Sequence, residues 1–172
     1  DNICSYFDVP VQHVSGKILK RMGRKGDAAD LTKLFDRIRS SVPDAVLRTT
    51  LMVGFPGETA KDFDALMAFV ESIQFDHLGV FTYSDADDLA SHPLSGHVSR
   101  KTAQQRRDAL MAVQADISRA RNEDRVGRAF PVLIEERGED ALYMGRASFQ
   151  APEGDGVVYA ASTDLDIGRV AL

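Results

Sequence analysis

The spacing of hydrophobic residues changes once along the chain, and this change limits the possible folds more than any other feature. From Ser5 to about Gly127, strand-like segments alternate with helix-like segments. Such alternation is typical of parallel βαβ units. After Gly127, short strand-like segments follow one another, separated by turns, which is typical of a small antiparallel barrel. The sequence therefore predicts an α/β domain over residues 1–127 and a small antiparallel β-barrel over residues 128–172.

Individual elements can be placed from the same spacing. In the first domain we expect strands over 5–13, 46–53 and 77–83, and helices over about 14–22, 28–41, 60–73 and 99–127. In the second domain we expect strands over 130–136, 142–147, 157–161 and 167–172. Thr59 and Asp62, three residues apart at the start of the third helix, have the spacing of a capping box.

The segment from Arg48 to Thr59 reads as a strand, a tight turn and the start of a helix. Gly54 has no Cβ, so backbone or ligand can approach it closely. Pro56-Gly57 suits a type II turn. In a β/α barrel a loop in this position lies on the catalytic face. The alternative is a well-formed βα turn with no further role.

Residues at the ends of the other strands are the remaining candidates for a binding site. Gln12 and His13 end the first strand, and His13 could transfer a proton, bind a ligand or cap a helix. Phe81 and Tyr83 end the third strand and could line an adenine pocket or only pack at the barrel rim.

No metal site is predicted from the acidic and histidine residues. Asp85, Asp87 and Asp88 could bind a cation, but a cluster without fixed spacing is more typical of a solvated loop. His77, His92 and His97 lack the spacing of metal ligands. The basic run 17–25 could touch nucleic acid, although a solvated helix face explains it as well.

The charge of the chain is concentrated in its last part. Residues 129–172 contain three basic and eight acidic residues, which account for the whole net charge of −5. An acidic module repels phosphate and favours a basic protein partner over RNA.

Other features of the composition limit the setting. No apolar run approaches the roughly 18–20 residues of a membrane helix, and no secretion signal opens the chain. Cys4 is the one cysteine, which we expect to be a buried strand residue. The chain opens with Asp1 and runs straight into a strand-like pattern, so we expect a segment of a longer protein, and its single cysteine fits a cytoplasmic setting.

Taken in order, five stretches resemble the radical S-adenosylmethionine methylthiotransferases over nearly the whole chain. They are YFDVPVQH, ILKRMGRKG, RTTLMVGFPGET, FTYS and GRASFQAPEGDGVVY. The resemblance implies the later strands of a TIM-like radical SAM (β/α) barrel, followed by a TRAM domain, a small OB-like antiparallel β-barrel.

Two features separate the branches of this family. The tRNA-modifying, MiaB-like branch usually has Gln-Ser-Gly where this chain has Gln12-His13, which is similar to the RimO-like branch. The turn 151–156 also looks RimO-like, although Gly154 replaces the usual aliphatic residue. The resemblance thus implies methylthiolation of the β-carbon of an aspartate on a basic small-subunit ribosomal protein, with the acidic TRAM-like domain meeting that protein. A tRNA methylthiotransferase and a non-catalytic docking module are the alternatives.

The resemblance also implies the cofactors, which are S-adenosylmethionine and two [4Fe-4S] clusters. One cysteine cannot hold either cluster, so both would be ligated outside this chain, and the chain alone would be inactive with no catalytic residue of its own. The residues implied to bind S-adenosylmethionine are Gln12, His13, Arg48, Thr50, Val53, Gly54, Phe81 and Tyr83.

Overall fold

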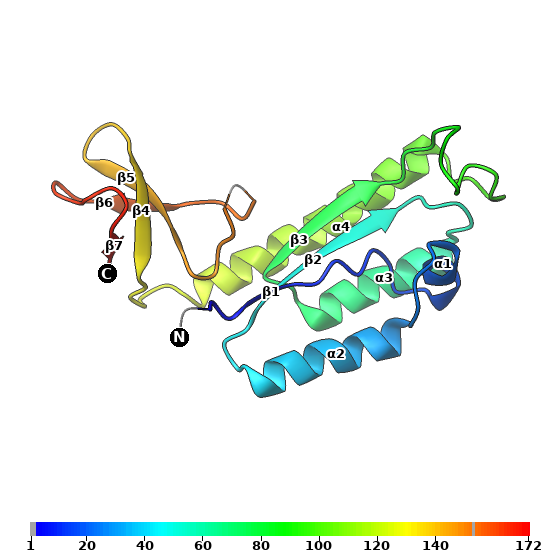
Figure 1. The fold of residues 1–172 in the computed structure, drawn as a ribbon, viewed down its shortest axis with the longest axis horizontal. Coiled ribbons are helices and arrows are strands. Elements are labelled where there is room, and N and C mark those ends of the chain that lie inside the picture. The colour runs from blue at the N-terminus through cyan, green and yellow to red at the C-terminus, as the bar shows by residue number, and fades with distance from the viewer. Residues whose placement is uncertain (1–2, 153) are drawn as a thin grey trace. The chain divides into compact units, whose positions relative to one another are not determined.

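The computed structural model describes residues 3–152 and 154–172, and these form two compact units. One unit is Phe7–Asp124, and the other is Arg125–Leu172 together with the N-terminal residues up to Tyr6. Figure 1 shows the elements of both units. Each unit is built around its own sheet.

The first unit contains a sheet of three strands in the order β1-β2-β3. They are β1 (Tyr6–Asp8), whose first residue is grouped with the second unit, β2 (Val46–Val53) and β3 (His77–Thr82). β2 and β3 are parallel, in register from Arg48 opposite His77 to Val53 opposite Thr82. The parallel sheet confirms the predicted α/β class.

The first strand is shorter than the predicted segment 5–13. Pro10 has no N–H to donate to the neighbouring strand, and Gln12 has a positive φ of 69°. Pairing nevertheless resumes at Gln12, which forms an isolated parallel bridge with Leu51. The chain thus follows β2 to its end although the regular strand stops at Asp8.

In the described residues two helices lie between β1 and β2, one lies between β2 and β3, and one follows β3. They are α1 (Gly16–Arg21), α2 (Ala28–Ser41), α3 (Ala60–Ile73) and α4 (Arg100–Glu123). The predicted capping box of α3 is confirmed, since the Thr59 and Asp62 side chains each accept the other's backbone N–H. α4 ends before the predicted limit near Gly127, and Gly127 itself has a φ of 80°, which a helix cannot continue.

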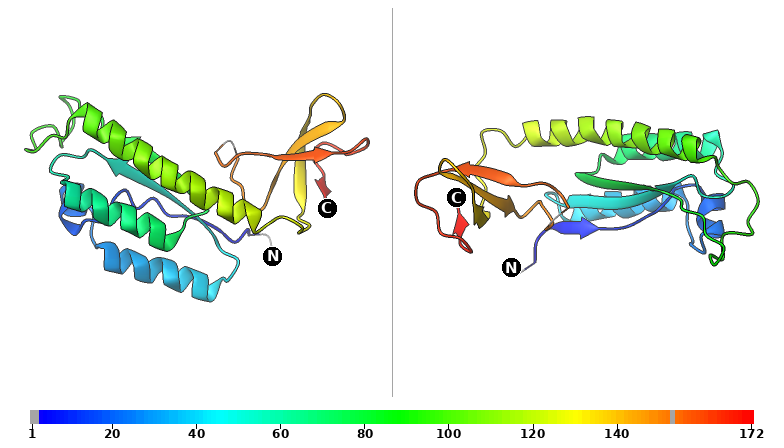
Figure 2. Two further views of the ribbon diagram at one scale, coloured as in Figure 1. Left: turned by 180° about the vertical axis from the view of Figure 1, so that it is seen from behind. Right: turned by 90° about the horizontal axis from the view of Figure 1, so that it is seen from above.

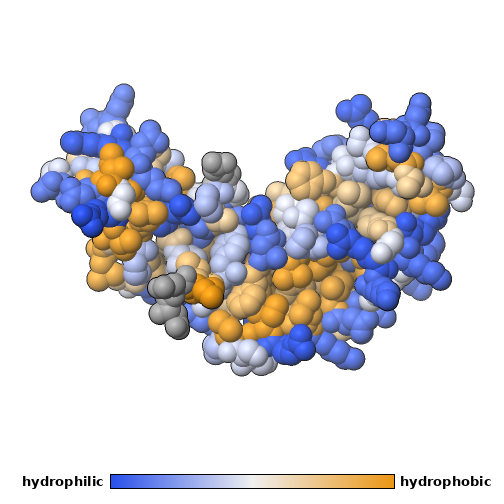
Figure 3. Space-filling view, in the orientation of Figure 1, coloured by the Kyte–Doolittle hydropathy of each residue, from blue (hydrophilic) through white to orange (hydrophobic). Residues whose placement is uncertain are grey.

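α2, α3 and α4 cover one face of the sheet, and the hydrophobic core lies between these helices and the strands. The core combines Phe35 of α2, Leu66 of α3 and Leu110 of α4 with Leu47 and Leu51 of β2. Figure 2 shows α4 running along β2 and β3. Hydrophobic side chains also gather on the surface over β1, α2 and α3 (Figure 3). The opposite face of the sheet is not covered by these helices.

The second unit contains a curled, antiparallel sheet in the order β6-β5-β4-β7. Its strands are β4 (Val132–Arg137), β5 (Leu142–Ala147), β6 (Val158–Ala161) and β7 (Val170–Ala171). Gly145 permits the close crossing of β4 and β5, since a Cβ there would lie 2.2 Å from the Leu133 carbonyl oxygen. The sheet forms half of the predicted small antiparallel barrel.

Cys4 and the turn 151–156 both belong to the second unit. Cys4 is exposed and precedes β1, so the prediction of a buried strand residue was wrong. Within the turn 151–156, Glu153 lies outside the described residues; Asp155 accepts hydrogen bonds from the Ala151 N–H and the Tyr6 hydroxyl.

Among the helices of the described residues, none combines the length and the apolar composition that a membrane crossing needs.

Candidate functional site

Every second side chain of β2 lies on the face of the three-stranded sheet that no helix of the described residues covers. Leu47, Leu51 and Val53 have no exposed surface, whereas Arg48, Thr50 and Met52 are half-exposed. Because side chains alternate across a strand, the second set lies on the face that the helices leave open. The register places His77, Gly79 and Phe81 of β3 beside them. This face, here called the open face, would be the inside of a β/α barrel.

The structure brings together part of the predicted site. Arg48, Thr50 and Phe81 lie on the open face, and Phe81 is 61% exposed. Gln12 reaches the same end of the sheet, where its backbone N–H donates to the Thr50 carbonyl oxygen at 2.8 Å. Val53 turns into the core and its carbonyl oxygen already accepts the Tyr83 N–H, so its side chain does not reach this face.

Gln12 is held in a conformation that L-residues seldom adopt. Its φ is 69°, and its carbonyl oxygen accepts the Met52 N–H at 2.7 Å. Backbone strain of this kind, about 1–3 kcal/mol, persists where the surroundings impose it and clusters at ligand sites. The Gln12 side chain lines a pocket of about 600 Å³ that also includes Met52 and Phe55. This volume is within the usual range for small-molecule sites.

Arg48 lies deeper on the open face than the other predicted residues, level with His77 and four residues before Met52. Its Nη1 is 3.9 Å from a carboxylate oxygen of Asp8 on β1. Both side chains are partly exposed, so this ion pair is loose.

The Tyr83 side chain is engaged within the protein. Its ring packs edge-on against Phe55, with the centroids 5.2 Å apart. Its hydroxyl donates to Asp85 Oδ1 at 2.9 Å and lies 2.9 Å from the Ser91 hydroxyl. Tyr83 therefore fixes the start of the loop that follows β3.

That loop also contains two of the histidines. His92 and His97 lie on either side of Asp85, with nitrogen–oxygen distances of 3.1 and 3.5 Å. Hydrogen bonds from His92 and Tyr83 lower the pKa of the Asp85 carboxyl against the effect of desolvation. Within residues 3–152 and 154–172, no three acidic, histidine or cysteine side chains are grouped so that they could hold a metal ion.

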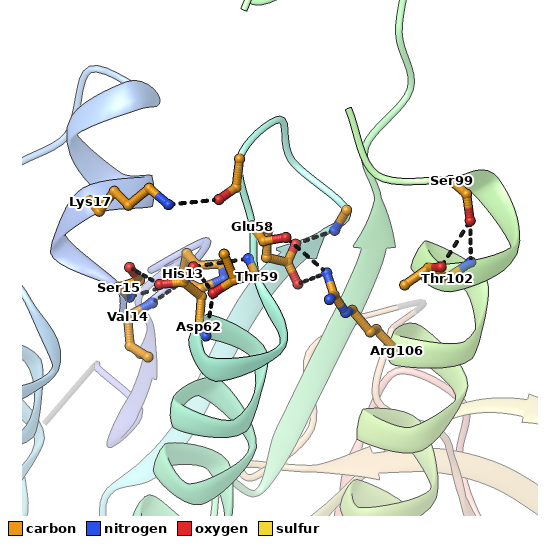
Figure 4. A network of polar contacts seen from close by, with 12 residues as sticks. His13, Val14, Ser15, Lys17, Glu58, Thr59, Asp62, Ser99, Thr102 and Arg106 are labelled. Atoms are coloured by element: carbon orange, nitrogen blue, oxygen red, sulfur yellow. Dashed lines mark hydrogen bonds and ion pairs between the residues drawn. The ribbon is translucent and has the colours of Figure 1, made fainter. Parts of the chain in front are cut away.

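His13 is fully buried and bound to its own backbone. Its Nδ1 accepts hydrogen bonds from the N–H groups of Val14 and Ser15 at 2.9 and 3.0 Å. Nε2 therefore carries the ring proton, and it has no partner among the described residues. The imidazole satisfies the backbone where α1 begins, and the Ser15 hydroxyl instead donates to Asp62 Oδ1 at 2.7 Å (Figure 4).

We expect His13 to make the stability of the first unit pH-dependent. Burial lowers the pKa of His13 from 6.5 to about 4. Between these values the unfolded chain binds a proton that the folded chain does not, so stability falls as the pH falls. The full loss is about 3 kcal/mol at 1.36 kcal/mol per pKa unit. Urea unfolding at pH 7 and pH 4.5 should show about 2 kcal/mol of this loss, because pH 4.5 is still above the folded pKa of His13. An equal loss in His13→Gln would contradict the assignment.

The polar contact that sequence reasoning missed lies under the loop after β2. The Glu58 side chain is fully buried, and its Oε1 accepts a hydrogen bond from Arg106 Nη1 of α4 at 3.0 Å (Figure 4). Its other oxygen accepts the Gly54 N–H. Burial raises the pKa of the Glu58 carboxyl, while Arg106 and the N–H groups of Gly54 and Phe55 oppose this rise. The buried Glu58 carboxylate therefore holds the backbone of Gly54 in place.

Both parts of the chain match known families. Residues 1–70 match the radical SAM superfamily, and residues 126–171 match the TRAM domain.

Relatives match the chain over most of its length. It is 61% identical over 158 residues to the ribosomal protein uS12 methylthiotransferase RimO of Desulfosudis oleivorans, covering 92% of this chain and 36% of that protein. The proteins of the same name from Clostridioides difficile and Fervidobacterium nodosum are 48% and 51% identical, covering 98% and 100% of this chain. They are themselves covered to 38% and 40%, so the chain spans well under half of each relative.

The sheet, its helices and the curled second unit are therefore those of a radical SAM protein with a TRAM domain. Within that superfamily, the chain belongs to the methylthiotransferase family, in its RimO-like branch.

Proposed function

We propose that this chain is part of an enzyme that methylthiolates the β-carbon of an aspartate on a basic small-subunit ribosomal protein by radical SAM chemistry. The names and the close similarity of the relatives support this proposal. The structural observation that carries it is that the 600 Å³ pocket lies at the carboxyl ends of the strands, next to the open face. Gln12 and Met52 line the pocket at this end of the sheet. Barrel enzymes bind their ligands at this end.

S-adenosylmethionine fits the groups present at this end. We propose that Gln12, Arg48, Thr50 and Phe81 hold it on the open face, with the Val53-Gly54 backbone and Tyr83 at the rim and His13 behind Gln12. When bound, this cofactor supplies the hydrogen-abstracting radical and the methyl group. The residues of this chain orient it and exclude water from one side.

The iron–sulfur clusters do not fit this chain. Clusters are held by several cysteine thiolates, and Cys4 is the one cysteine in the sequence. We therefore place the ligands of both clusters outside residues 1–172 and expect the chain to be inactive by itself.

The second unit is proposed to meet the substrate protein. Residues 129–172 carry eight acidic and three basic residues, and one of the basic ones, Arg146, is 2.6 Å from Glu135. The remaining acids favour a basic protein over RNA. We propose a functional boundary between residues 127 and 128 and a cytoplasmic location, where ribosomal proteins are available.

A modification assay tests the proposed function. The full-length gene product containing this chain is reconstituted with iron and sulfide without oxygen, then incubated with S-adenosylmethionine and either uS12 or tRNA. Mass spectrometry should find a methylthio group on an aspartate of uS12. Methylthiolated tRNA together with unmodified uS12 would favour the tRNA enzyme, and a steep salt dependence of tRNA binding would accompany it. If no iron–sulfur absorption develops, the chain is a docking module.

Arg48→Ala should weaken S-adenosylmethionine binding about tenfold, because a guanidinium pairs strongly with the methionyl carboxylate. Isothermal titration of the full-length protein measures the dissociation constant. Arg119→Ala is the control, since Arg119 pairs with Asp116 on the exposed side of α4. Unchanged affinity in Arg48→Ala would remove Arg48 from the pocket.

A further inference from the structure

The pocket beside Gln12 has a basic edge that the proposed cofactor contacts do not use. Its walls are mainly apolar, from Met52, Phe55 and Leu89, whereas Arg21 and Arg24 line it where α1 ends. An apolar pocket with a few convergent polar groups is the usual form of a ligand site.

Both arginines are held in place through backbone contacts. Arg21 Nη2 donates to the Ser95 carbonyl oxygen at 2.9 Å, and Arg24 Nη1 donates to the Pro10 carbonyl oxygen at 3.2 Å. Arg21 also lies directly on Gly57, where a Cβ would be only 1.9 Å from its Nη1. The absence of a side chain at Gly57 thus makes room for this guanidinium.

Neither arginine has an acidic partner among the described residues. Two arginines of the same unit differ in this respect: Arg48 faces Asp8, and Arg106 is bonded to Glu58. Arg21 and Arg24 show no ion pair within residues 3–152 and 154–172, so most of their ten N–H donors lack an acceptor in the protein. Two positioned guanidinium groups without an acid at the edge of an apolar pocket define a site for an anion. The planar, bidentate arrangement of their donors matches a carboxylate.

We propose that Arg21 and Arg24 bind the carboxylate of the side chain that the enzyme modifies, and that they thereby select an acidic acceptor. This inference rests on the proposed function. The methionyl group of S-adenosylmethionine provides the other carboxylate, but it also carries an ammonium and a sulfonium, so its net charge is positive. Arg48 is already proposed to pair with that carboxylate, and two further guanidinium groups would be repelled by the net positive charge of the cofactor. An aspartate in a peptide carries a single negative charge and an apolar Cβ, which suits the basic edge and the apolar wall together.

The test compares two peptides from uS12 that differ only in aspartate or asparagine at the acceptor position. Their binding to the full-length protein is measured by fluorescence anisotropy. We expect Arg24→Gln to weaken binding of the aspartate peptide about tenfold, the loss of one charge-assisted pair, and to leave the asparagine peptide and S-adenosylmethionine unaffected. Lys25→Gln removes the same charge from an exposed residue outside the pocket and should change each affinity by less than about threefold.

Arg24→Gln is preferred to a change at Arg21, because Arg21 also supports the loop at Ser95 and Gly57. Arg24→Lys keeps the charge but not the bidentate geometry and should recover part of the preference. Equal weakening of both peptides, or weakening of S-adenosylmethionine or tRNA binding instead, overturns the inference. If the wild type itself does not distinguish the peptides, the proposed protein substrate fails as well. If the wild type prefers the aspartate peptide and Arg24→Gln shows the same preference, the role of the two arginines is contradicted while the proposed protein substrate stands.

Discussion

Replacing Glu58 with Gln should destabilise the chain by about 3 kcal/mol, because it leaves the Arg106 guanidinium nearly buried without a counter-charge. The Arg106 side chain is only 12% exposed, and Glu58 has no exposed surface. The Gln side chain can still accept the Gly54 N–H, so the loss arises mainly from the charge. Arg106→Gln should be similarly costly, since it leaves a buried carboxylate.

A double-mutant cycle measures this pair directly. Urea unfolding of wild type, Glu58→Gln, Arg106→Gln and the double variant gives the coupling energy. We expect the double variant to lose at least about 2 kcal/mol less than the sum of the single losses. Arg119→Gln is the matched control on the same helix: its pair with Asp116 is exposed and should contribute less than about 0.5 kcal/mol. A Glu58→Gln loss as small as that of the control would show that the pair is unimportant.

Local patterns in the sequence were sufficient for the limits of β2 and α2, although not for those of β1 and α4. β2 and α2 have the predicted limits, 46–53 and 28–41, because each has a strong apolar repeat. The capping box at Thr59 and Asp62 was also visible, since both of its partners lie within four residues. These features could be predicted because the residues that determine them are neighbours in the sequence.

Features that depend on distant partners could not be predicted. Glu58 follows a Pro-Gly turn, where no local pattern indicates a buried ion pair, and its partner Arg106 is 48 residues away. Arg21 and Arg24 read as part of a solvated basic helix, because no local signal shows that the loop carrying Leu89 and Ser95 folds over them.

The candidate site contains some features that the sequence predicts and others that it does not. Arg48 and Thr50, which the resemblance implied, lie on one face of β2, whereas Val53 lies on the other. The positive φ of Gln12 was not predictable, because it follows from pairing with Thr50 and Met52 of another strand. The predicted role of His13 in cofactor binding stays a prediction, while its hydrogen bonds at the start of α1 explain its burial.

Gly54→Ala should destabilise the chain by about 3 kcal/mol or more, for two separate reasons. Gly54 has a φ of 80°, and a side chain in this region costs about 1–2 kcal/mol. A Cβ at this position would also lie 2.5 Å from the Cβ of Ala103 in α4, which is buried. Relieving such an overlap in a packed core typically costs about 1–3 kcal/mol more. The glycine that was expected to allow a ligand to approach closely is thus also required by helix packing.

Two comparison variants separate these reasons. Gly127 has the same φ of 80°, and a Cβ there would meet nothing within 4 Å, so Gly127→Ala should show the conformational cost alone, about 1–2 kcal/mol. Adding Ala103→Gly to Gly54→Ala removes the overlap. The stability gained in this way should outweigh the roughly 1 kcal/mol that glycine costs inside a helix, so the double variant should be more stable than Gly54→Ala alone. Urea unfolding of wild type and these three variants measures the differences. Equal losses in Gly54→Ala and Gly127→Ala would show that α4 yields without cost, and that Gly54 is needed only for its backbone conformation.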